Sequence, residues 1–251
     1  MMSTLNSFLP ISLEEIGKID FMSRMNIKYV IPKTLLPSLL EMFGDDFYVQ
    51  EISGKRSFLY QSLYYDTVDY AMYNTHQNGK LDRFKIRTRE YLDTQSCFLE
   101  IKHKSNKGLT QKIRIENETL HLIEQKENKE FINSYSPYLF TTLEAKLKTS
   151  YHRIILLNKE KTERITIDYD LYFRNADTGN KVELPQLSIV EIKKKPYITS
   201  FTAIKMRESH INPYRISKYC LGASLTDSGI KQNRIKQKIR YITKITDFIY
   251  E

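Results

Sequence analysis

Cysteine, long apolar runs and a secretion signal are all lacking or scarce in this chain, and each absence excludes a class of protein. The two cysteines, Cys97 and Cys220, are too few and too far apart for a disulfide framework, which favours a reducing compartment. No run approaches the ~18 to 20 apolar residues that a membrane-spanning helix needs. Glu14 and Glu15 interrupt the stretch where a signal peptide would have its apolar core. We therefore expect a cytoplasmic protein with no membrane span of its own.

Glycine-rich phosphate loops and zinc-binding spacings are missing as well. The eight glycines are scattered, and none belongs to a G-x-x-x-x-G-K-[ST] or G-x-G-x-x-G pattern, so no backbone cradle for phosphates is expected. The five histidines show no spacing typical of a zinc site. If this chain binds phosphates, its side chains must do so.

Positive charge is what the sequence has in excess. There are 39 lysines and arginines against 30 aspartates and glutamates, a formal net charge of +9. This excess favours an anionic partner, which could be nucleic acid, a phosphate compound or an acidic membrane surface. Net charge does not choose among these three.

Alternation of polar and apolar residues dominates the chain and predicts a mostly antiparallel β-protein with attached helices, an α+β fold. A chain of 251 residues that is 41% hydrophobic can bury one large core, so we expect a single domain over residues 1–251. A C-terminal helix is expected over about 229–249, with an isoleucine stripe that either packs on the sheet or lies on a membrane surface. The expected strands are 21–31, 57–67, 82–91, 97–104, 109–116, 151–158, 163–173 and 187–195.

Cations recur at every second position along these strands. In "DRFKIRTREY", residues 82–91, the side chains of Arg83, Lys85, Arg87 and Arg89 share one face of an extended segment. One such charged face is typical of a strand with a solvated side, but the same pattern occurs in six strands. The other charged positions are Arg24, Lys28, Glu100, Lys102, Lys104, Lys112, Arg114, Glu116, Arg164, Asp168, Glu191, Lys193 and Lys195.

Closing such a sheet into a barrel would gather the cations into a polar lumen that only a polyanion could neutralise. The occasional carboxylates on the same faces would then hold a hard cation such as Mg²⁺ or Mn²⁺ that bridges phosphate oxygens. Glu191 is the first candidate for this role, and Glu100 and Asp168 are further candidates.

Nine motifs occur in an order that resembles the catalytic domain of the vacuolar transporter chaperone (VTC) family. These are polyphosphate polymerases among the triphosphate tunnel metalloenzymes. The resemblance covers about residues 20–225 and implies an eight-stranded antiparallel β-tunnel with flanking helices. It also implies transfer of the γ-phosphate of ATP to polyphosphate with a divalent metal, usually Mn²⁺. The motifs are "RMNIKY", "SLYYDT", "KIRTREY", "FLEIKHK", "KIRIE", "YHRIILL", "ERITIDYDL", "VEIKKK" and "RISKYCLG".

The resemblance also implies roles for individual residues. Glu191 in "VEIK" looks like the metal-holding carboxylate, and Ser217 with Lys218 looks like the Ser-Lys pair near the tunnel mouth. Arg215 stands where a lysine is familiar, and an Arg fork binds phosphate differently from a Lys point charge. Arg83 and Lys85 are expected at the mouth, and Lys193 follows Glu191 on the same face. The residues that look like the phosphate-binding wall are Lys28, Arg87, Arg89, Lys102, Lys112, Arg114, Arg153 and Arg164, of which Arg87, Arg89, Arg153 and Arg164 are expected to clamp the triphosphate.

One departure bears on the reaction. The hydrolytic tunnel enzymes resemble one another in a Glu-x-Glu-x-Lys strand, whereas the corresponding residues here are Arg24, Asn26 and Lys28. The loss of two acidic metal contacts argues against a dedicated triphosphatase and fits the polymerase branch.

Three alternatives remain at this stage. A triphosphatase or a non-catalytic sensor of phosphate chains would have the same cationic face. The 18 tyrosines permit a binder of single-stranded nucleic acid, which ranks below both because no RNA-binding signature appears. The family resemblance also implies that a membrane protein could be a partner.

Overall fold

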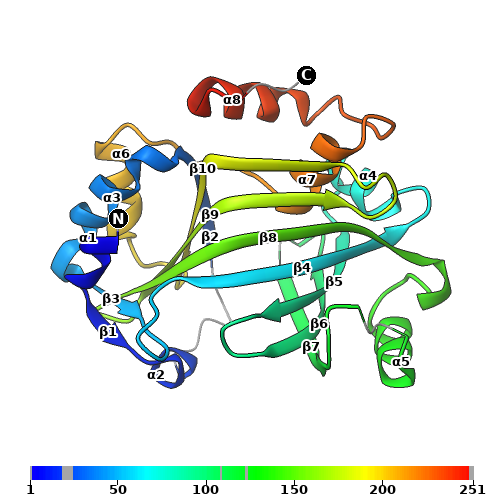
Figure 1. Cartoon of the computed structure of the whole chain (residues 1–251), viewed down its shortest axis with the longest axis horizontal. Helices are drawn as coiled ribbons and strands as arrows, with labels where there is room; N and C mark the ends of the chain where they lie inside the picture. Colours follow the sequence, from blue (N-terminus) through cyan, green and yellow to red (C-terminus); the bar gives the residue numbers. More distant parts are fainter. Residues whose placement is uncertain (1, 19–24, 108, 122–123, 249–251) are drawn as a thin grey trace.

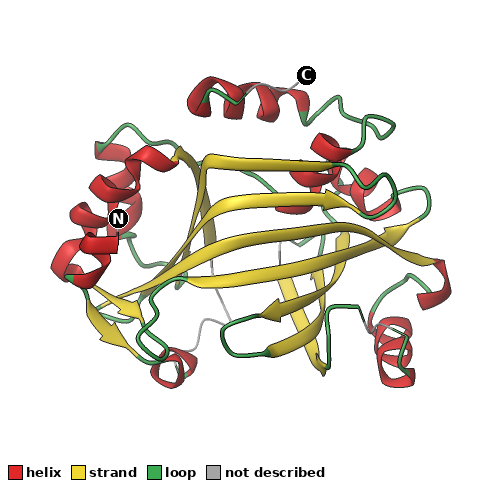
Figure 2. Ribbon diagram, viewed as in Figure 1, coloured by secondary structure: helices red, strands yellow, loops and turns green. Residues whose placement is uncertain are grey.

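The computed structural model describes residues 2–18, 25–107, 109–121 and 124–248. Eight antiparallel strands form the main sheet, as predicted, with flanking helices (Figures 1 and 2). Two short strands, β1 (Leu9–Ile11) and β3 (Phe47–Gln50), pair in parallel beside it, and β3 joins the sheet along β8. The order across the sheet is β2 (Met25–Pro32), β10 (Lys181–Lys194), β9 (Glu163–Asn175), β8 (Leu143–Asn158), β4 (Phe58–Thr67), β5 (Arg83–Tyr91), β6 (Ser96–Lys104) and β7 (Thr110–Asn117).

The expected closure into a barrel is wrong for the part of the chain that the structure describes. The two outermost strands, β2 and β7, are not paired with each other, so the sheet is strongly curved but open. Alternation along each strand predicts which face carries the cations, but it does not determine whether the two end strands come close enough to pair.

The outer face of β5, β6 and β7 carries the alternating apolar residues and packs against α5 (Lys126–Tyr135). Ile86, Leu99 and Ile101 from the strands are buried together with Phe131 and Ile132 of the helix. The register of the predicted strands is therefore correct, because the cations at the intervening positions face the other way.

A second group of helices covers the end of the sheet where β2, β9 and β10 lie (Figure 1). It consists of α1 (Met2–Asn6), α3 (Leu36–Phe43) and α6 (Phe201–Glu208), with the short turns η1 (Lys33–Leu35) and η2 (Gly44–Asp46) around α3. Leu36, Leu39, Leu40 and Phe43 of α3 are all buried, as a helix with apolar residues three and four apart requires.

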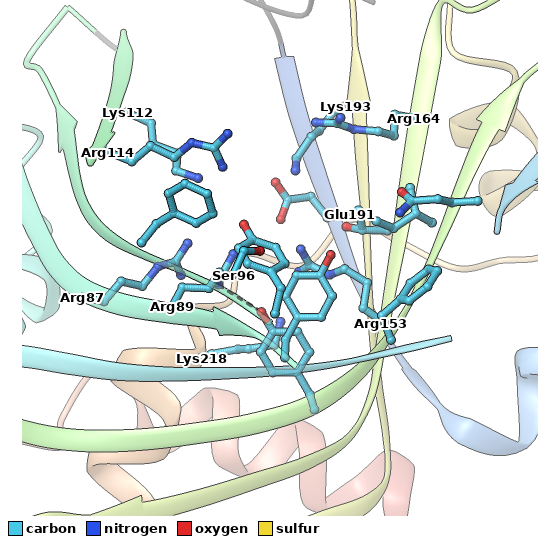
Figure 3. A pocket seen from close by; sticks show the side chains of 18 of the residues that line it. Arg87, Arg89, Ser96, Lys112, Arg114, Arg153, Arg164, Glu191, Lys193 and Lys218 are labelled. Atoms are coloured by element: carbon cyan, nitrogen blue, oxygen red, sulfur yellow. Dashed lines mark hydrogen bonds between the residues drawn. The ribbon is translucent and has the colours of Figure 1, made fainter. Parts of the chain in front are cut away.

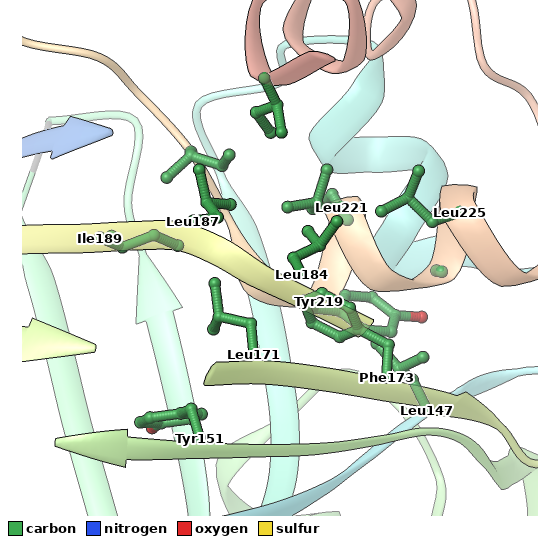
Figure 4. Close-up of a cluster of buried hydrophobic side chains, with 14 of the residues drawn as sticks. Leu147, Tyr151, Leu171, Phe173, Leu184, Leu187, Ile189, Tyr219, Leu221 and Leu225 are labelled. Atoms are coloured by element: carbon green, nitrogen blue, oxygen red, sulfur yellow. The ribbon is translucent and has the colours of Figure 1, made fainter. Parts of the chain in front are cut away.

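Three further helices share a second apolar cluster with β8, β9 and β10 (Figure 4). They are α4 (Ala71–Gln77), α7 (Lys218–Thr226) and α8 (Lys236–Thr246), while α2 (Leu13–Gly17) and η3 (Phe140–Thr142) lie elsewhere. The C-terminal helix is shorter than predicted. Its isoleucine stripe is confirmed as a packing face, because Ile235, Ile239 and Ile242 are buried. Ile249 lies outside the described residues.

Helix α7 packs closely enough on the sheet to require a glycine in its middle. A Cβ added at Gly222 would lie 2.4 Å from Phe173 Cδ1 and 2.7 Å from Leu147 Cδ2. Tyr219 of the same helix donates a hydrogen bond of 2.5 Å to Asp66 at the end of β4. These contacts position the first residues of α7, which the next section places in a cavity. No helix in the described ranges has both the length and the apolar character that crossing a membrane requires.

Candidate functional site

All eight strands of the main sheet contribute side chains to one cavity of about 660 Å³ (Figure 3). Among the described residues, two carboxylates, Asp93 and Glu191, line it beside eleven cationic residues. Such an excess in a concave, low-dielectric site concentrates anions and suits a ligand with several negative charges. The eleven cations are Lys28, Lys85, Arg87, Arg89, Lys102, Lys112, Arg114, Arg153, Arg164, Lys193 and Lys218.

Behind one wall of the cavity, a buried carboxylate holds the cations of β5 and β7. Glu100 on β6 is 1% exposed and accepts hydrogen bonds from Arg87 Nε at 2.8 Å and Nη2 at 2.6 Å. It also forms an ion pair with Lys112. Burial would raise the pKa of Glu100, but Arg87, Arg89 and Lys112 outweigh it and lower the pKa below its usual value. Glu100 is therefore an ionised counter-ion that orients Arg87 and Lys112.

The opposite wall repeats this arrangement. Asp168 on β9 is 2% exposed and accepts two hydrogen bonds from Arg153 of β8, from Nε at 2.5 Å and Nη2 at 2.8 Å. Lys218 of α7 pairs with the same carboxylate. Burial would raise the pKa of Asp168, yet Arg153 and Lys218 lower it below its usual value. Arg153 and Lys218, which are far apart in sequence, are thus held side by side by one aspartate.

Tyrosines also orient the arginines of the cavity. Arg87 Nη1 donates to Tyr64 Oη at 2.9 Å, and Arg89 Nη2 donates to Tyr151 Oη at 3.0 Å. Burial would raise the pKa of Tyr64, but Arg87 and Arg89 outweigh it and lower the pKa to about 8. The Arg153 guanidinium lies over the Tyr60 ring, 4.8 Å from its centroid. Fixed guanidinium groups can bind an anion without losing much side-chain freedom.

The N-terminus of α7 forms part of the cavity lining. Ser217 is the N-cap of this helix and accepts from the backbone N–H of Cys220 at 3.3 Å and from Lys85 Nζ at 2.8 Å. Lys28 Nζ donates to the carbonyl of Ile216 at 3.2 Å. These contacts attach the segment before α7 to cations of β2 and β5, so the predicted Ser217 and Lys218 reach the cavity through a helix that sequence periodicity did not predict.

Crowding of the lysines lowers their affinity for protons. Burial, with Lys28 as the second cause, lowers the pKa of Lys102 to about 7. Burial also lowers the pKa of Lys112 and of Lys218 to about 8, although each has a carboxylate partner. When an anion binds in the cavity near neutral pH, these lysines would therefore take up protons.

Glu191 is the carboxylate best placed for a divalent cation. It lies on β10 with Thr166 of β9 and Lys28 of β2 as its Cα partners, and it forms an ion pair with Lys28 Nζ at 3.7 Å. Burial would raise the pKa of Glu191, but Lys28, Lys193 and Lys102 lower it well below its usual value. The Thr166 hydroxyl is buried and has no hydrogen-bond partner.

No group of three or more His, Cys, Asp or Glu side chains in the described ranges could hold a metal by itself. Mg²⁺ and similar ions in phosphate-transfer sites are commonly held by one or two carboxylates together with substrate phosphates. Glu191 and the hydroxyl of Thr166 opposite it fit this mode of metal binding. The carboxylates of Glu100 and Asp168 are instead paired with arginine and lysine side chains, so the structure does not support their predicted role as metal ligands.

The structure brings most of the predicted residues together, with two exceptions among the cations. Arg83 and Arg215 do not line the cavity, and Arg83 donates to the Lys80 carbonyl at 2.9 Å. Lys85, expected at the mouth beside Arg83, lies inside the lining. The predicted residues that line the cavity are Lys28, Lys85, Arg87, Arg89, Lys102, Lys112, Arg114, Arg153, Arg164, Glu191, Lys193, Ser217 and Lys218.

Tyr64, Tyr151 and Thr166 are three of the lining residues that were not predicted as part of the site. A signal for two of them was present in the sequence. Tyr151 precedes Arg153 by two positions and Thr166 follows Arg164 by two, so each must share the face of a predicted cation. Tyr64 needed the pairing of β4 with β5, which places it opposite Arg87.

Comparison with known proteins identifies one family. The VTC domain matches residues 23–226. No curated protein matches the chain. One similar solved structure is a "putative adenylate cyclase" from Vibrio parahaemolyticus, 13% identical, with 78% of this chain and 95% of that chain covered and a TM-score of 0.47. Another is a "putative adenylyl cyclase" from Hippeastrum with a dominant triphosphatase activity, 15% identical, with 80% and 95% covered and a TM-score of 0.43. At these identities and TM-scores, nothing about this chain's activity follows from either likeness.

Proposed function

Because the chain belongs to the VTC domain family, we propose that it is a polyphosphate polymerase that transfers the γ-phosphate of ATP to a growing chain of inorganic polyphosphate. The observation that carries this proposal is the cavity wall, in which eleven cations from strands and one helix converge on the same space. A chain of phosphates offers charge along its whole length, and this wall offers complementary charge on every side.

The proposed reaction needs no protein nucleophile. Phosphoryl transfer distributes negative charge over the equatorial oxygens, so catalysis consists mostly of positioning and electrostatic stabilisation. Arg87, Arg89, Arg153 and Arg164 bind the triphosphate, and the fixed pairs with Glu100 and Asp168 keep Arg87 and Arg153 in place. A terminal oxygen of the polyphosphate chain attacks the γ-phosphorus in line. The bond to the β-phosphate oxygen breaks, and ADP leaves with the electron pair.

A divalent cation, Mn²⁺ or Mg²⁺, would be held by Glu191 and would supply positive charge that bridges phosphate oxygens. The chain's own lysines would neutralise the rest of the ligand's charge. Lys28, Lys102 and Lys193 surround Glu191 closely enough to lower its pKa. They would bind phosphate oxygens next to the cation.

One feature of β2 favours transfer to phosphate over transfer to water. Asn26 lines the cavity at the position where a hydrolytic tunnel strand would carry a carboxylate, and it pairs with Lys193 of β10. Arg24, the other substituted position, lies outside the described residues. With few carboxylates in the lining, the site is poorly equipped to activate a water molecule.

Incubation of the purified protein with ATP and Mn²⁺, followed by a gel stained for polyphosphate and an assay for ADP, tests the proposal. Long chains formed in step with ADP are the expected result. Free phosphate as the sole product would identify a triphosphatase and overturn the polymerase assignment. Tight polyphosphate binding without turnover would identify a sensor.

A matched pair of charge removals tests the cavity itself. Arg114 lines the cavity and lies over the Phe98 ring, 4.2 Å from its centroid, whereas Arg83 lies outside the lining. Arg114→Gln should lower kcat/KM for ATP by about 100-fold, the usual effect of removing one electrostatic contact from a transition state. Arg83→Gln removes the same charge and should leave activity within about twofold of the wild type. Glu191→Gln should abolish synthesis, since no other lining carboxylate adjoins it.

Nucleic acid is a poor fit to the same surface. Stacking on bases needs accessible aromatic rings, but Tyr60, Tyr64 and Tyr70 are each less than 10% exposed. Competition between tripolyphosphate and an oligonucleotide of equal charge would show the preference directly. The predicted cytoplasmic location and the membrane-protein partner remain predictions, which co-purification from cells with a tagged chain would test.

A further inference from the structure

The hydroxyl of Thr166 is a buried polar group with no hydrogen-bond partner. Thr166 is 2% exposed and lies on β9 in the cavity lining, between the positions of Arg164 and Asp168. A buried hydroxyl without a hydrogen bond costs free energy, so such a group in a folded protein calls for a partner. Other buried hydroxyls without partners, those of Thr149 and Ser188, do not line the cavity.

The residue opposite Thr166 on the neighbouring strand is Glu191. The two are Cα partners in the antiparallel pair of β9 and β10, and both face the cavity. Side chains at directly opposite positions have Cβ atoms about 4.5 to 5.5 Å apart. A hydroxyl and a carboxylate at that separation can both reach one ion bound at about 2.1 Å from each oxygen.

Glu191 is itself available for such an ion. It forms an ion pair of 3.7 Å with Lys28 Nζ, which is longer than the contacts that engage Glu100 and Asp168. The ammonium groups of Lys28, Lys193 and Lys102 nevertheless lie near enough to lower its pKa. They would repel a bare divalent cation, so metal binding here needs the negative charge of a phosphate ligand.

We propose that Thr166 Oγ1 and the Glu191 carboxylate form a two-oxygen subsite for a divalent cation that binds together with the phosphate chain. The proposal rests on the proposed function in that it places a phosphate chain in this cavity. It adds a ligand to the single carboxylate considered so far and gives the unpartnered hydroxyl its partner. Threonine hydroxyls are suitable hard oxygen ligands for Mg²⁺ and Mn²⁺.

Titration calorimetry with tripolyphosphate, with and without Mn²⁺, measures the coupling between metal and phosphate without any turnover. The wild type should bind tripolyphosphate about 10-fold more tightly with Mn²⁺ than without, within the usual range for coupled ligands. Thr166→Val has nearly the same shape but lacks the hydroxyl. It should reduce that enhancement to about twofold and leave the affinity without metal within about twofold of the wild type. Thr166→Ser keeps the hydroxyl and should retain the full enhancement.

Each other outcome overturns the subsite. An equal loss of affinity with and without Mn²⁺ in Thr166→Val would mean that the hydroxyl binds phosphate directly. No change in either affinity would mean that the hydroxyl has no ligand. Should Thr166→Val not fold, Thr166→Ala removes the same hydroxyl without adding bulk and must give the same loss of enhancement.

The same measurement separates this proposal from the proposed function. Metal-coupled binding of tripolyphosphate without ATP turnover would support the subsite and overturn only the polymerase assignment. Polyphosphate synthesis by the wild type, together with an unchanged coupling between Mn²⁺ and tripolyphosphate in Thr166→Val, would support the polymerase assignment and overturn only the subsite. Failure of the wild type to bind tripolyphosphate at all would overturn both.

Discussion

Removing the charge of Asp168 should destabilise the protein when the cavity holds no ligand, but much less when it holds phosphate. Asp168 is 2% exposed and is the common partner of Arg153 and Lys218. Asp168→Asn keeps the shape but leaves two cations without a counter-charge. Loss of one partner from a buried ion pair typically costs about 3 to 5 kcal/mol. We expect the lower end, about 3 kcal/mol, because the side chains of Arg153 and Lys218 are 11% and 13% exposed to the cavity.

In a chain of this length, 1 kcal/mol corresponds to roughly 2 to 4 °C in melting temperature. The variant should therefore unfold about 6 to 12 °C below the wild type when measured by thermal unfolding without ligand. Saturating tripolyphosphate would supply the missing negative charge next to Arg153 and Lys218. The difference in melting temperature should then shrink by about half, and the affinity for tripolyphosphate should rise by about 10-fold, which is 1.4 kcal/mol of the 3 kcal/mol.

Asp170→Asn is the matched control on the same strand. Asp170 is 37% exposed and pairs with Lys33 at 2.5 Å outside the cavity, and asparagine tolerates its left-handed backbone with φ of 52°. This substitution should cost less than about 1 kcal/mol and leave binding unchanged. A melting difference in Asp168→Asn that tripolyphosphate does not reduce would refute the view that the ligand substitutes for this carboxylate.

Three further predictions concern other parts of the site and the fold. Because the pKa of Lys102 is about 7, raising the pH from 7 to 9 neutralises a cation that the phosphate ligand needs, and binding weakens. Lys102→Arg stays charged, so its affinity for tripolyphosphate relative to the wild type, measured by calorimetry, should rise about 10-fold between pH 7 and pH 9. A fully buried lysine would give a larger change, but Lys102 faces the open cavity. Affinities of the two proteins that change in parallel with pH would contradict the assignment. Gly222→Ala should lose about 2 kcal/mol in denaturant unfolding, since its Cβ would overlap Phe173, whereas Gly17→Ala has nothing within 4 Å and should be neutral. Asp66→Ala should lose about 3 kcal/mol or more, because the carboxylate accepts from the backbone of Met72 and Tyr73 and from Tyr219, and a loss below 1 kcal/mol would show that water replaces it.

Sequence patterns predicted the strands well because each strand has one apolar and one charged face. In β5, Ile86 is fully buried on the outer side while Arg87 and Arg89 line the cavity. Because successive side chains of a strand point to opposite faces, the apolar and the cationic residues of β5 must lie on different faces. The short strands β1 and β3 and the helices α6 and α7 were not predicted. They are short or buried on all sides, and such segments show no clear periodicity; all nine residues of α7 except Lys218 are buried.

The same alternation predicted which residues belong to the site, but it did not predict which of them pair with one another. Glu100, Asp168 and Glu191 look alike in the sequence, each a carboxylate on a cationic face. The fold places Glu100 and Asp168 behind the wall, in contact with two cations each, and leaves Glu191 in the cavity with a longer ion pair of 3.7 Å to Lys28. Which strands become neighbours decides this, and strand order is not written in any local pattern.

Local sequence thus determined the direction of each strand's side chains and the sign of the charge they carry, because those depend on alternation along a single strand. Only the tertiary structure decided which cations share a counter-ion, that Arg83 and Arg215 lie outside the cavity, and that the sheet stays open between β2 and β7. These outcomes depend on the order and register of strands far apart in the chain. They also depend on where α7 crosses the sheet, which the close approach of Gly222 to Phe173 allows.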